Sequence, residues 1–192
     1  MDRPLSDTEI SKSLDGEVRI VSYHELKRFK SIENLLHPCG RAAILYPQSS
    51  QGEGHWVGVL CYRKPKGKIT VEVFDPYGHM PDLGDLKVDS ELSFLDPHHR
   101  KGMGIHRAYL SELLIDFLER NPKIGRVEYN EKPFQKWGQH INTCGRWVIA
   151  RLMHNNMSLK EFAKEFVGRG NKDKFVTDYT NRLFPFLTIT RH

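Results

Sequence analysis

A single cysteine followed by an apolar run is the clearest candidate nucleophile in this sequence. Cys144 stands in the stretch FQKWGQHINTCGRWVIARL, between a polar loop that contains glycine and a run that predicts a helix. Unpaired backbone N–H groups and the positive end of the helix dipole favour a thiolate at such a position. The alternative is a small buried hydrophobic residue, the usual role of an intracellular cysteine. Cys39 and Cys61 suit that alternative better, because Cys61 lies on the apolar face of an expected strand and no apolar helix follows Cys39.

A base for this nucleophile is expected at the end of a β-hairpin. The runs HWVGVLCYR and KITVEVFD are joined by the turn-like KPKG and predict two antiparallel strands. A register centred on Pro65 places apolar residues opposite one another, and one further step places His55 opposite Asp75. Directly opposite Cβ atoms lie about 5 Å apart, so the imidazole and the carboxylate can form a hydrogen bond. The carboxylate would fix the histidine tautomer and stabilise the imidazolium. The alternative interpretation is an ordinary cross-strand His–Asp pair at a sheet edge. The apolar pairs of this register are Cys61–Ile69, Val59–Val71 and Val57–Val73.

A thiolate that attacks an amide also needs hydrogen-bond donors for the oxyanion. The backbone N–H of Cys144 is one candidate, and a glutamine amide just upstream is the other. Gln135 and Gln139 both qualify, and Gln135 is preferred because it follows the expected strand GRVEYN and its exit EKPF. Gly145 is expected to leave backbone room beside the sulfur for a substrate carbonyl. Trp137 is interpreted either as a wall of the cleft or as a surface residue.

The elements that must position these residues alternate along the chain. Capping boxes and apolar periodicity predict helices over 22–29, 31–36, 105–120, 144–156 and 158–166. Strands are expected over 41–47, 55–63, 68–75 and 125–130. Strands in the middle with helices on both flanks predict an α+β fold. We expect one domain over 1–192, with a helical N-terminal part (1–40), a catalytic core (41–156) and a C-terminal helical extension (157–192).

Composition narrows the class of protein. The 192 residues are 39% hydrophobic and 28% charged, with a formal net charge of +5, as in an ordinary globular domain. The basic runs KRFK, RKPKGK, HHRK and RGNKDK are scattered, so solvated loops are favoured over a weak nucleic-acid contact. No apolar run is long enough for a membrane span, and the N-terminus lacks the apolar core of a secretory signal, so an intracellular protein is expected. Three cysteines without a CxxC spacing argue against a disulfide scaffold and a zinc site, and the histidines match no strong ligand pattern. Those histidines are His98, His99, His106 and His140.

Four motifs, in order, resemble a known family. GHWVGVL, VFDPYG, a glutamine and NTCGRW are similar to the adenain/SUMO-protease superfamily (clan CE) of cysteine peptidases, above all to the adenovirus-type maturation proteases of large DNA viruses. The resemblance covers about 45–153. It implies an α+β fold whose central mixed sheet packs on the helix that carries the cysteine. It also implies His55 as the base, Asp75 as its orienting residue, Cys144 as the nucleophile and a glutamine at the oxyanion hole. Trp56 matches the aromatic residue that packs beside the family's site, whereas neither glutamine matches the family's usual spacing.

The activity implied by this resemblance is that of a cysteine endopeptidase, a hydrolase that needs no metal or cofactor. A viral maturation protease that processes structural or polyprotein precursors is the leading interpretation, which places the protein in the host cytoplasm or nucleus and in the virion. A ubiquitin- or SUMO-like deconjugating protease is the first alternative. A non-catalytic nucleic-acid-binding module is the second. Adenovirus-type members use peptide or DNA activators, and only the mild basicity of this chain hints at one.

Overall fold

The computed structural model of the chain describes residues 3–47, 54–63, 67–79, 108–136 and 141–188. Within these residues the strands form one five-stranded sheet in the order β1-β2-β3-β4-β5. The two outer pairs, β1–β2 and β4–β5, are parallel, and the two inner pairs are antiparallel. This mixed sheet with helices on both faces confirms the predicted α+β fold. The strands are β1 (Arg19–Ser22), β2 (Arg41–Pro47), β3 (Gly54–Arg63), β4 (Ile69–Phe74) and β5 (Gly125–Tyr129).

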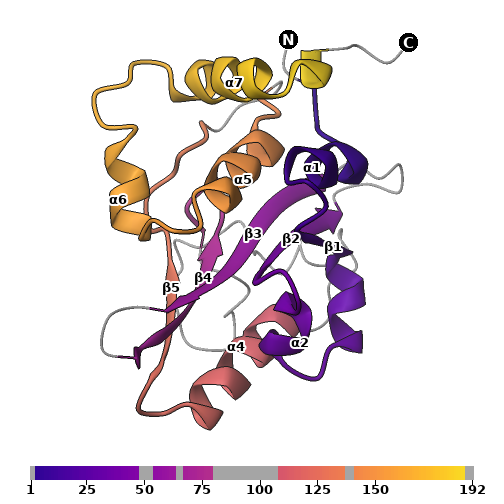
Figure 1. Cartoon of the computed structure of the whole chain (residues 1–192), viewed down its shortest axis with the longest axis vertical. Coiled ribbons are helices and arrows are strands. Elements are labelled where there is room, and N and C mark those ends of the chain that lie inside the picture. Colours follow the sequence, from indigo (N-terminus) through magenta and orange to yellow (C-terminus); the bar gives the residue numbers. More distant parts are fainter. Residues whose placement is uncertain (1–2, 48–53, 64–66, 80–107, 137–140, 189–192) are drawn as a thin grey trace.

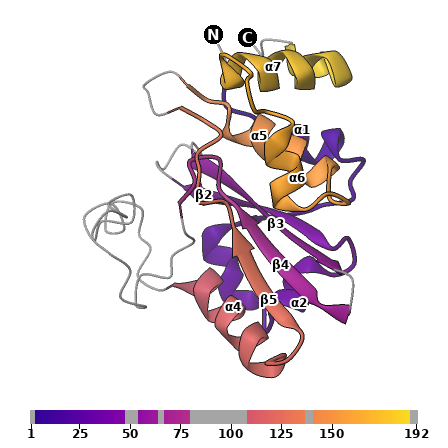
Figure 2. The same ribbon diagram turned by 90° about the vertical axis from the view of Figure 1, so that its left-hand side faces the viewer.

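Helices cover both faces of the sheet (Figures 1 and 2). One face carries α1 (Asp7–Ser13), α5 (Cys144–Met153), α6 (Leu159–Lys164), α7 (Lys172–Leu183) and the 3-10 helix η4 (Pro185–Thr188). The other face carries the 3-10 helix η1 (Tyr23–Arg28), α2 (Ile32–Leu36) and α4 (Tyr109–Arg120). Each face has its own apolar cluster, so the sheet is buried on both sides. None of these helices is both long and apolar enough to span a bilayer.

The alternation of side chains along β3 explains the two clusters. Trp56 and Leu60 belong to the cluster under α5, whereas Val57 and Val59 belong to the cluster under α2 and α4. Such alternation is the period-2 pattern of a strand that is buried on both faces. Gly58 lies where α5 crosses β3, and an added Cβ there would touch Leu152 at 3.4 Å. A methyl group would fit here in ordinary van der Waals contact with α5, whereas a larger side chain would push the helix away from the strand.

Helix α5 is central to the fold, because all of its residues except Met153 are buried. It carries two guanidinium groups into the interior, those of Arg146 and Arg151. The Arg151 guanidinium forms two hydrogen bonds of 2.7 Å to the Glu72 carboxylate on β4. The same guanidinium donates to the carbonyl oxygens of His154 and Met157. A buried ion pair is tolerated when its remaining donors are satisfied in this way. The pair therefore fixes the C-terminal end of α5 against the sheet.

The predicted capping boxes are present. The Ser22 N–H donates to Glu25 at 2.8 Å at the start of η1, and the Ser158 N–H donates to Glu161 at 2.8 Å at the start of α6. The structure adds a third box that the sequence analysis did not identify, between Ser6 and Glu9 at the start of α1. Each box satisfies backbone N–H groups that the helix itself leaves unpaired.

Two expectations about the fold were wrong. The N-terminal part is not helical throughout, because β1 adds a parallel edge strand beside β2. This strand has four residues, too few for a recognisable alternation. The hairpin register is shifted by two residues, so that Cys61 faces Val71 and Val59 faces Val73. A shift of two leaves every side chain on its original face, and matching apolar residues therefore cannot distinguish the two registers.

Candidate active site

The predicted contact between His55 and Asp75 is present. The His55 Nε2 lies 2.8 Å from the Asp75 Oδ1, and both residues are buried. The two residues are not directly opposite as expected, because the pairing of β3 with β4 ends at Gly58 and Phe74. The chain turns after β4, where the Gly78 N–H donates to the Asp75 carbonyl oxygen at 2.8 Å. This turn lets the carboxylate reach the imidazole from beyond the end of the ladder.

Asn130 holds Asp75 in place from the neighbouring strand. The Asp75 N–H donates to the Asn130 Oδ1 at 2.9 Å, and the Asn130 Nδ2 donates to the Asp75 carbonyl oxygen. Asn130 is buried and directly follows β5, which runs parallel to β4. The sequence analysis missed this residue. Its signal was a polar residue at the end of a strand, but only the strand order places it beside Asp75.

Cys144 is the first residue of α5 and lies within hydrogen-bonding reach of His55. Its residue surface is 6% exposed, whereas Cys39 and Cys61 are half-buried elsewhere. The thiol is close enough to the His55 imidazole to help raise the pKa of that histidine. Because Nε2 is engaged by Asp75, Nδ1 is the ring nitrogen available to the sulfur. The structure therefore brings the three residues predicted from sequence into one Cys–His–Asp constellation.

The electrostatics of this constellation favour the imidazolium. Burial lowers the pKa of His55, but the Asp75 charge and hydrogen bond, helped by Cys144, outweigh it and raise the pKa to about 10. A second histidine, His79, has its Nδ1 3.8 Å from the Asp75 Oδ2. Burial lowers the pKa of His79, and the charge of His55 adds to that effect, although Asp75 opposes it. His55 is thus the protonated histidine near neutral pH, and it can pair with a thiolate at Cys144.

Tyr77 joins the constellation to the expected oxyanion region. Its ring stacks on the His55 imidazole with centroids 4.7 Å apart, a geometry in which the aromatic face stabilises an imidazolium. Its backbone N–H donates to the Asp75 Oδ1 at 2.8 Å. Burial, together with the negative charges of Cys144 and Asp75, raises the pKa of Tyr77 to about 12, so the phenol stays protonated. Tyr77 is the aromatic residue of the DPYG motif, although its position against the histidine was not predicted.

Gln135 lies beside this tyrosine. Its Nε2 donates to the Tyr77 hydroxyl at 3.1 Å and to the Ile141 carbonyl oxygen at 2.9 Å. Its backbone N–H donates to the Pro76 carbonyl oxygen, which ties the strand exit to the turn that follows Asp75. The side-chain amide therefore belongs to the same site as His55. Gln139 and Trp137 lie outside the described residues, so the preference for Gln135 stays a prediction.

Gly145 takes part in a packing contact that the sequence analysis did not predict. An added Cβ would lie 3.1 Å from the Leu5 Cβ and 3.3 Å from the Trp56 Cδ1. The space on the Cβ side of Gly145 is filled by this packing. The expected role of Gly145 beside the sulfur stays a prediction. Trp56 is buried, and its Nε1 donates to the Leu5 carbonyl oxygen at 2.9 Å. Trp56 and Gly145 thus hold the segment before α1 against the start of α5.

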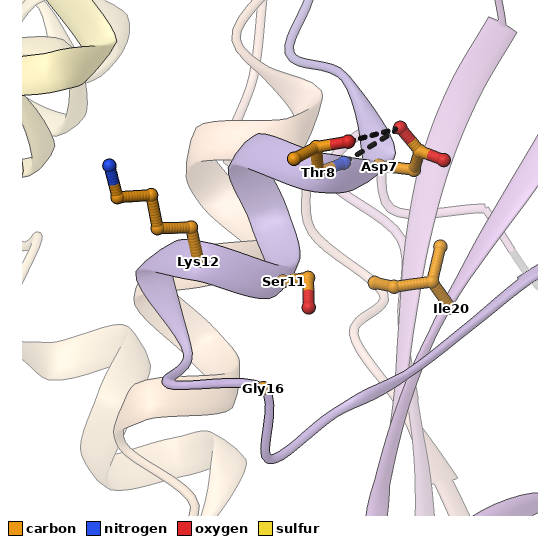
Figure 3. Close-up of a pocket in the computed structure, with 6 residues that line it drawn as sticks. All are labelled: Asp7, Thr8, Ser11, Lys12, Gly16 and Ile20. Atoms are coloured by element: carbon orange, nitrogen blue, oxygen red, sulfur yellow. Dashed lines mark hydrogen bonds between the residues drawn. The ribbon is translucent and has the colours of Figure 1, made fainter.

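A hollow of about 440 Å³ next to α1 carries no part of this constellation (Figure 3). Its polar groups partly satisfy one another, because the Thr8 N–H and hydroxyl both donate to the Asp7 Oδ1. The histidines considered as metal ligands all lie outside the described residues. Within the described parts of the chain, no group of three or more His, Cys, Asp or Glu residues is arranged to hold a metal ion. The hollow is lined by Asp7, Thr8, Ser11, Lys12, Gly16 and Ile20.

Comparison with solved structures shows a fold shared with a viral protease. The crystal structure of an ASFV protease matches 96% of this chain and 69% of its own, with a TM-score of 0.50 and 14% identity. The central domain of an uncharacterized Legionella pneumophila protein matches 96% of this chain and 98% of its own, with a TM-score of 0.44 and 16% identity. A de-sumoylating protease matches 93% of this chain and 70% of its own, with a TM-score of 0.32 and 13% identity. At 14% identity, the likeness to the ASFV protease shows a shared protease-like fold.

Sequence comparison defines the family more narrowly. No family model matches the chain. Uncharacterized protein V9 of Sputnik virophage is 31% identical over 160 residues, which cover 83% of this chain and 81% of the virophage protein. The chain belongs to the same protein family as this virophage protein.

Proposed function

We propose that this protein is a thiol endopeptidase with Cys144 as its nucleophile. The observation that carries the proposal is the position of His55, whose Nε2 lies 2.8 Å from the Asp75 carboxylate and whose pKa is raised by both Asp75 and Cys144. A nucleophile, a base and a group that orients the base are the three parts that acyl transfer requires. A merely structural His–Asp pair would not need a thiol at the start of a helix beside it.

The chemistry follows from these positions. The Cys144 thiolate attacks the carbonyl carbon of the substrate, and the Cys144 backbone N–H and the Gln135 amide stabilise the oxyanion. The His55 imidazolium then donates its proton to the leaving amine, and a thioester remains on Cys144. His55 next accepts a proton from a water molecule that attacks the thioester, which releases the carboxylic acid product and restores the Cys144 thiolate and the His55 imidazolium. Asp75 keeps its charge throughout and stabilises the imidazolium.

The substrate class that we propose is a precursor of viral structural proteins, cut at short linear sites. Two findings support it: the family relationship to a virophage protein, and the fold shared with a protease of another virus. We further propose that this cleavage takes place during maturation of the virion. Deconjugation of a ubiquitin-like modifier is the alternative outcome of the experiment below.

The test is labelling with two electrophilic probes, a peptide carrying a chloromethyl ketone and a ubiquitin-family protein carrying a C-terminal vinyl sulfone. Mass spectrometry reports both the residue labelled and the probe preferred. We expect the peptide probe to label Cys144, and labelling to vanish in Cys144→Ser but not in Cys61→Ser. Burial raises the pKa of Cys61, so it remains a thiol at neutral pH. Faster labelling of Cys39 or Cys61, or unchanged peptide cleavage by Cys144→Ser, would contradict the proposal.

A further inference from the structure

One of the two aspartates of helix α7 is buried in the protein interior. Asp173 lies in the first turn of α7 and is 7% exposed. Asp178, one and a half turns further along, is exposed and forms an ion pair of 2.6 Å with Lys174. A carboxylate is rarely buried unless several donors satisfy it. The hydrogen-bond donors around Asp173 therefore explain how its carboxylate can be buried.

Three donors from different positions converge on the Asp173 carboxylate. The Lys136 backbone N–H donates to Oδ2 at 3.0 Å. The Thr143 hydroxyl donates to Oδ1 at 2.6 Å, and the Trp147 indole N–H donates to the same oxygen at 3.2 Å. The carboxylate therefore links α7 both to the segment after β5 and to the start of α5.

Two of these donors belong to residues next to the groups that are expected to bind the oxyanion. Lys136 directly follows Gln135, and Thr143 directly precedes Cys144. Thr143 is also the N-cap residue of α5, yet its side chain makes no capping hydrogen bond and is directed to Asp173 instead. A single carboxylate thus fixes the backbone next to each of the two groups expected to bind the oxyanion, the Gln135 amide and the Cys144 N–H.

We propose that Asp173 is a positioning residue that holds the two oxyanion donors at their working separation. This inference rests on the proposed thiol acyl-transfer function and adds a residue to it. Preorganised donors act on charge that develops during attack, so a small displacement weakens the transition state far more than the ground state. The residue does not touch the reacting atoms. Its effect passes through Lys136 and Thr143.

The docking of α7 does not depend on Asp173 alone. The Arg146 guanidinium on α5 donates to the Thr180 hydroxyl at 2.8 Å and to the Asn181 Oδ1 at 2.7 Å, near the other end of α7. Val176 is fully buried in the same cluster as α5. Asp173→Asn should therefore keep α7 in place. Its oxygen can still accept from Thr143, but its NH₂ group meets the Lys136 N–H, and two donors then face each other.

The experiment compares two reactions of the same thiol in the folded full-length chain. In the first, the Cys144 sulfur attacks the carbonyl carbon of p-nitrophenyl acetate through an oxyanion, p-nitrophenolate leaves and an acetyl thioester forms. In the second, the sulfur displaces iodide from iodoacetamide, a step with no oxyanion. Asp173→Asn should slow acetylation of Cys144 by about 10-fold to 100-fold, because a misplaced donor loses much of its effect. Alkylation should change less than about twofold, because it does not use the donors. Asp178→Asn is the matched control on the same helix and should change neither rate.

A second pair of variants tests the same inference if Asp173→Asn does not fold. Thr143→Val removes one donor to Asp173 without changing the side-chain shape, and Thr143→Ser restores the hydroxyl. Slower acetylation in Thr143→Val with recovery in Thr143→Ser would support the inference. Equal losses in acetylation and alkylation, or no loss in either, would overturn it.

Failure of the inference is distinguishable from failure of the proposed function. Wild-type protein that is acetylated at Cys144 but cleaves no peptide would contradict only the peptidase proposal. Wild-type protein that is alkylated but not acetylated at Cys144 would overturn the inference, because no oxyanion stabilisation would exist for Asp173 to support.

Discussion

Replacement of Asp75 by asparagine should separate the electrostatic role of this residue from its structural role. The asparagine keeps the shape of the side chain, and its amide oxygen can still accept from the Tyr77 N–H, which lies 2.8 Å from the Asp75 Oδ1. It removes the negative charge next to the His55 Nε2. Burial of His55 is then no longer opposed by a carboxylate. We expect the imidazole to be neutral at pH 7 in this variant, and the proton for the leaving amine to be missing.

The magnitude follows from the pKa of His55. The pKa lies at about 10 in the folded protein, compared with an ordinary value of 6.5, in spite of the opposing effect of burial. At about 1.4 kcal/mol for each pKa unit, this difference corresponds to about 5 kcal/mol in favour of the imidazolium. Asp75 is the largest cause of the increase, and Cys144 supplies the remainder. We therefore expect turnover at pH 7 to fall by about 10²–10⁴-fold in Asp75→Asn.

The assay measures peptide turnover and alkylation of Cys144 as a function of pH. His55 carries a raised pKa, so its contribution to stability is complete below about 6.5 and is lost as the pH rises through about 10. Wild-type turnover should decline over the same alkaline window, whereas Asp75→Asn should be low throughout. Asp116→Asn is the control, because Asp116 forms only a surface ion pair with Arg120. A folded Asp75→Asn protein with turnover within about threefold of wild type would refute the reasoning, because one pKa unit alone is worth tenfold.

Three further predictions address the oxyanion hole, the N-terminal helix and the packing beside His55. Gln135→Ala should lower turnover by about 10²–10³-fold, or ~3–4 kcal/mol, with little change in KM, whereas Gln139→Ala should lower turnover only mildly. Steady-state kinetics of both variants on one peptide substrate test this prediction. The reverse pattern would make Gln139 the donor. Glu9→Gln should lower the free energy of unfolding by about 1–2 kcal/mol at pH 7, after allowance for solvent screening, because Arg3 and the Ser6 cap lower the pKa of Glu9 to about 2. In urea titrations this difference should vanish as the pH falls from 4.5 towards 2, and a difference that persists at pH 2 would contradict the linkage. Gly54→Ala should destabilise the fold by about 1–3 kcal/mol, because the added methyl group would clash with a backbone carbonyl of β2. Thermal unfolding measures this loss. An unchanged melting temperature would show that β2 and β3 can separate without cost.

The sequence alone predicted which residues are candidates for the chemistry and which elements contain them. Cys144 before an apolar helix, His55 at the start of an apolar strand and Asp75 at the end of the next are local patterns, and the structure brings all three together. The capping boxes at Ser22 and Ser158 likewise depend on residues three positions apart. Local patterns are predictable because the interactions that produce them join neighbours in the chain.

The tertiary structure decided how these residues meet. Two hairpin registers that differ by two residues bury the same side chains, and the turn after Asp75, not a directly opposed pair, brings the carboxylate to His55. The roles of Asn130 and Asp173 could not be predicted from local patterns, because their partners are 55 and 30 residues away in the chain. The packing that Gly145 permits was not predicted either, because it involves the distant segment around Leu5. Strand order and helix docking decide which polar residues support a site. Both result from the packing of the whole chain.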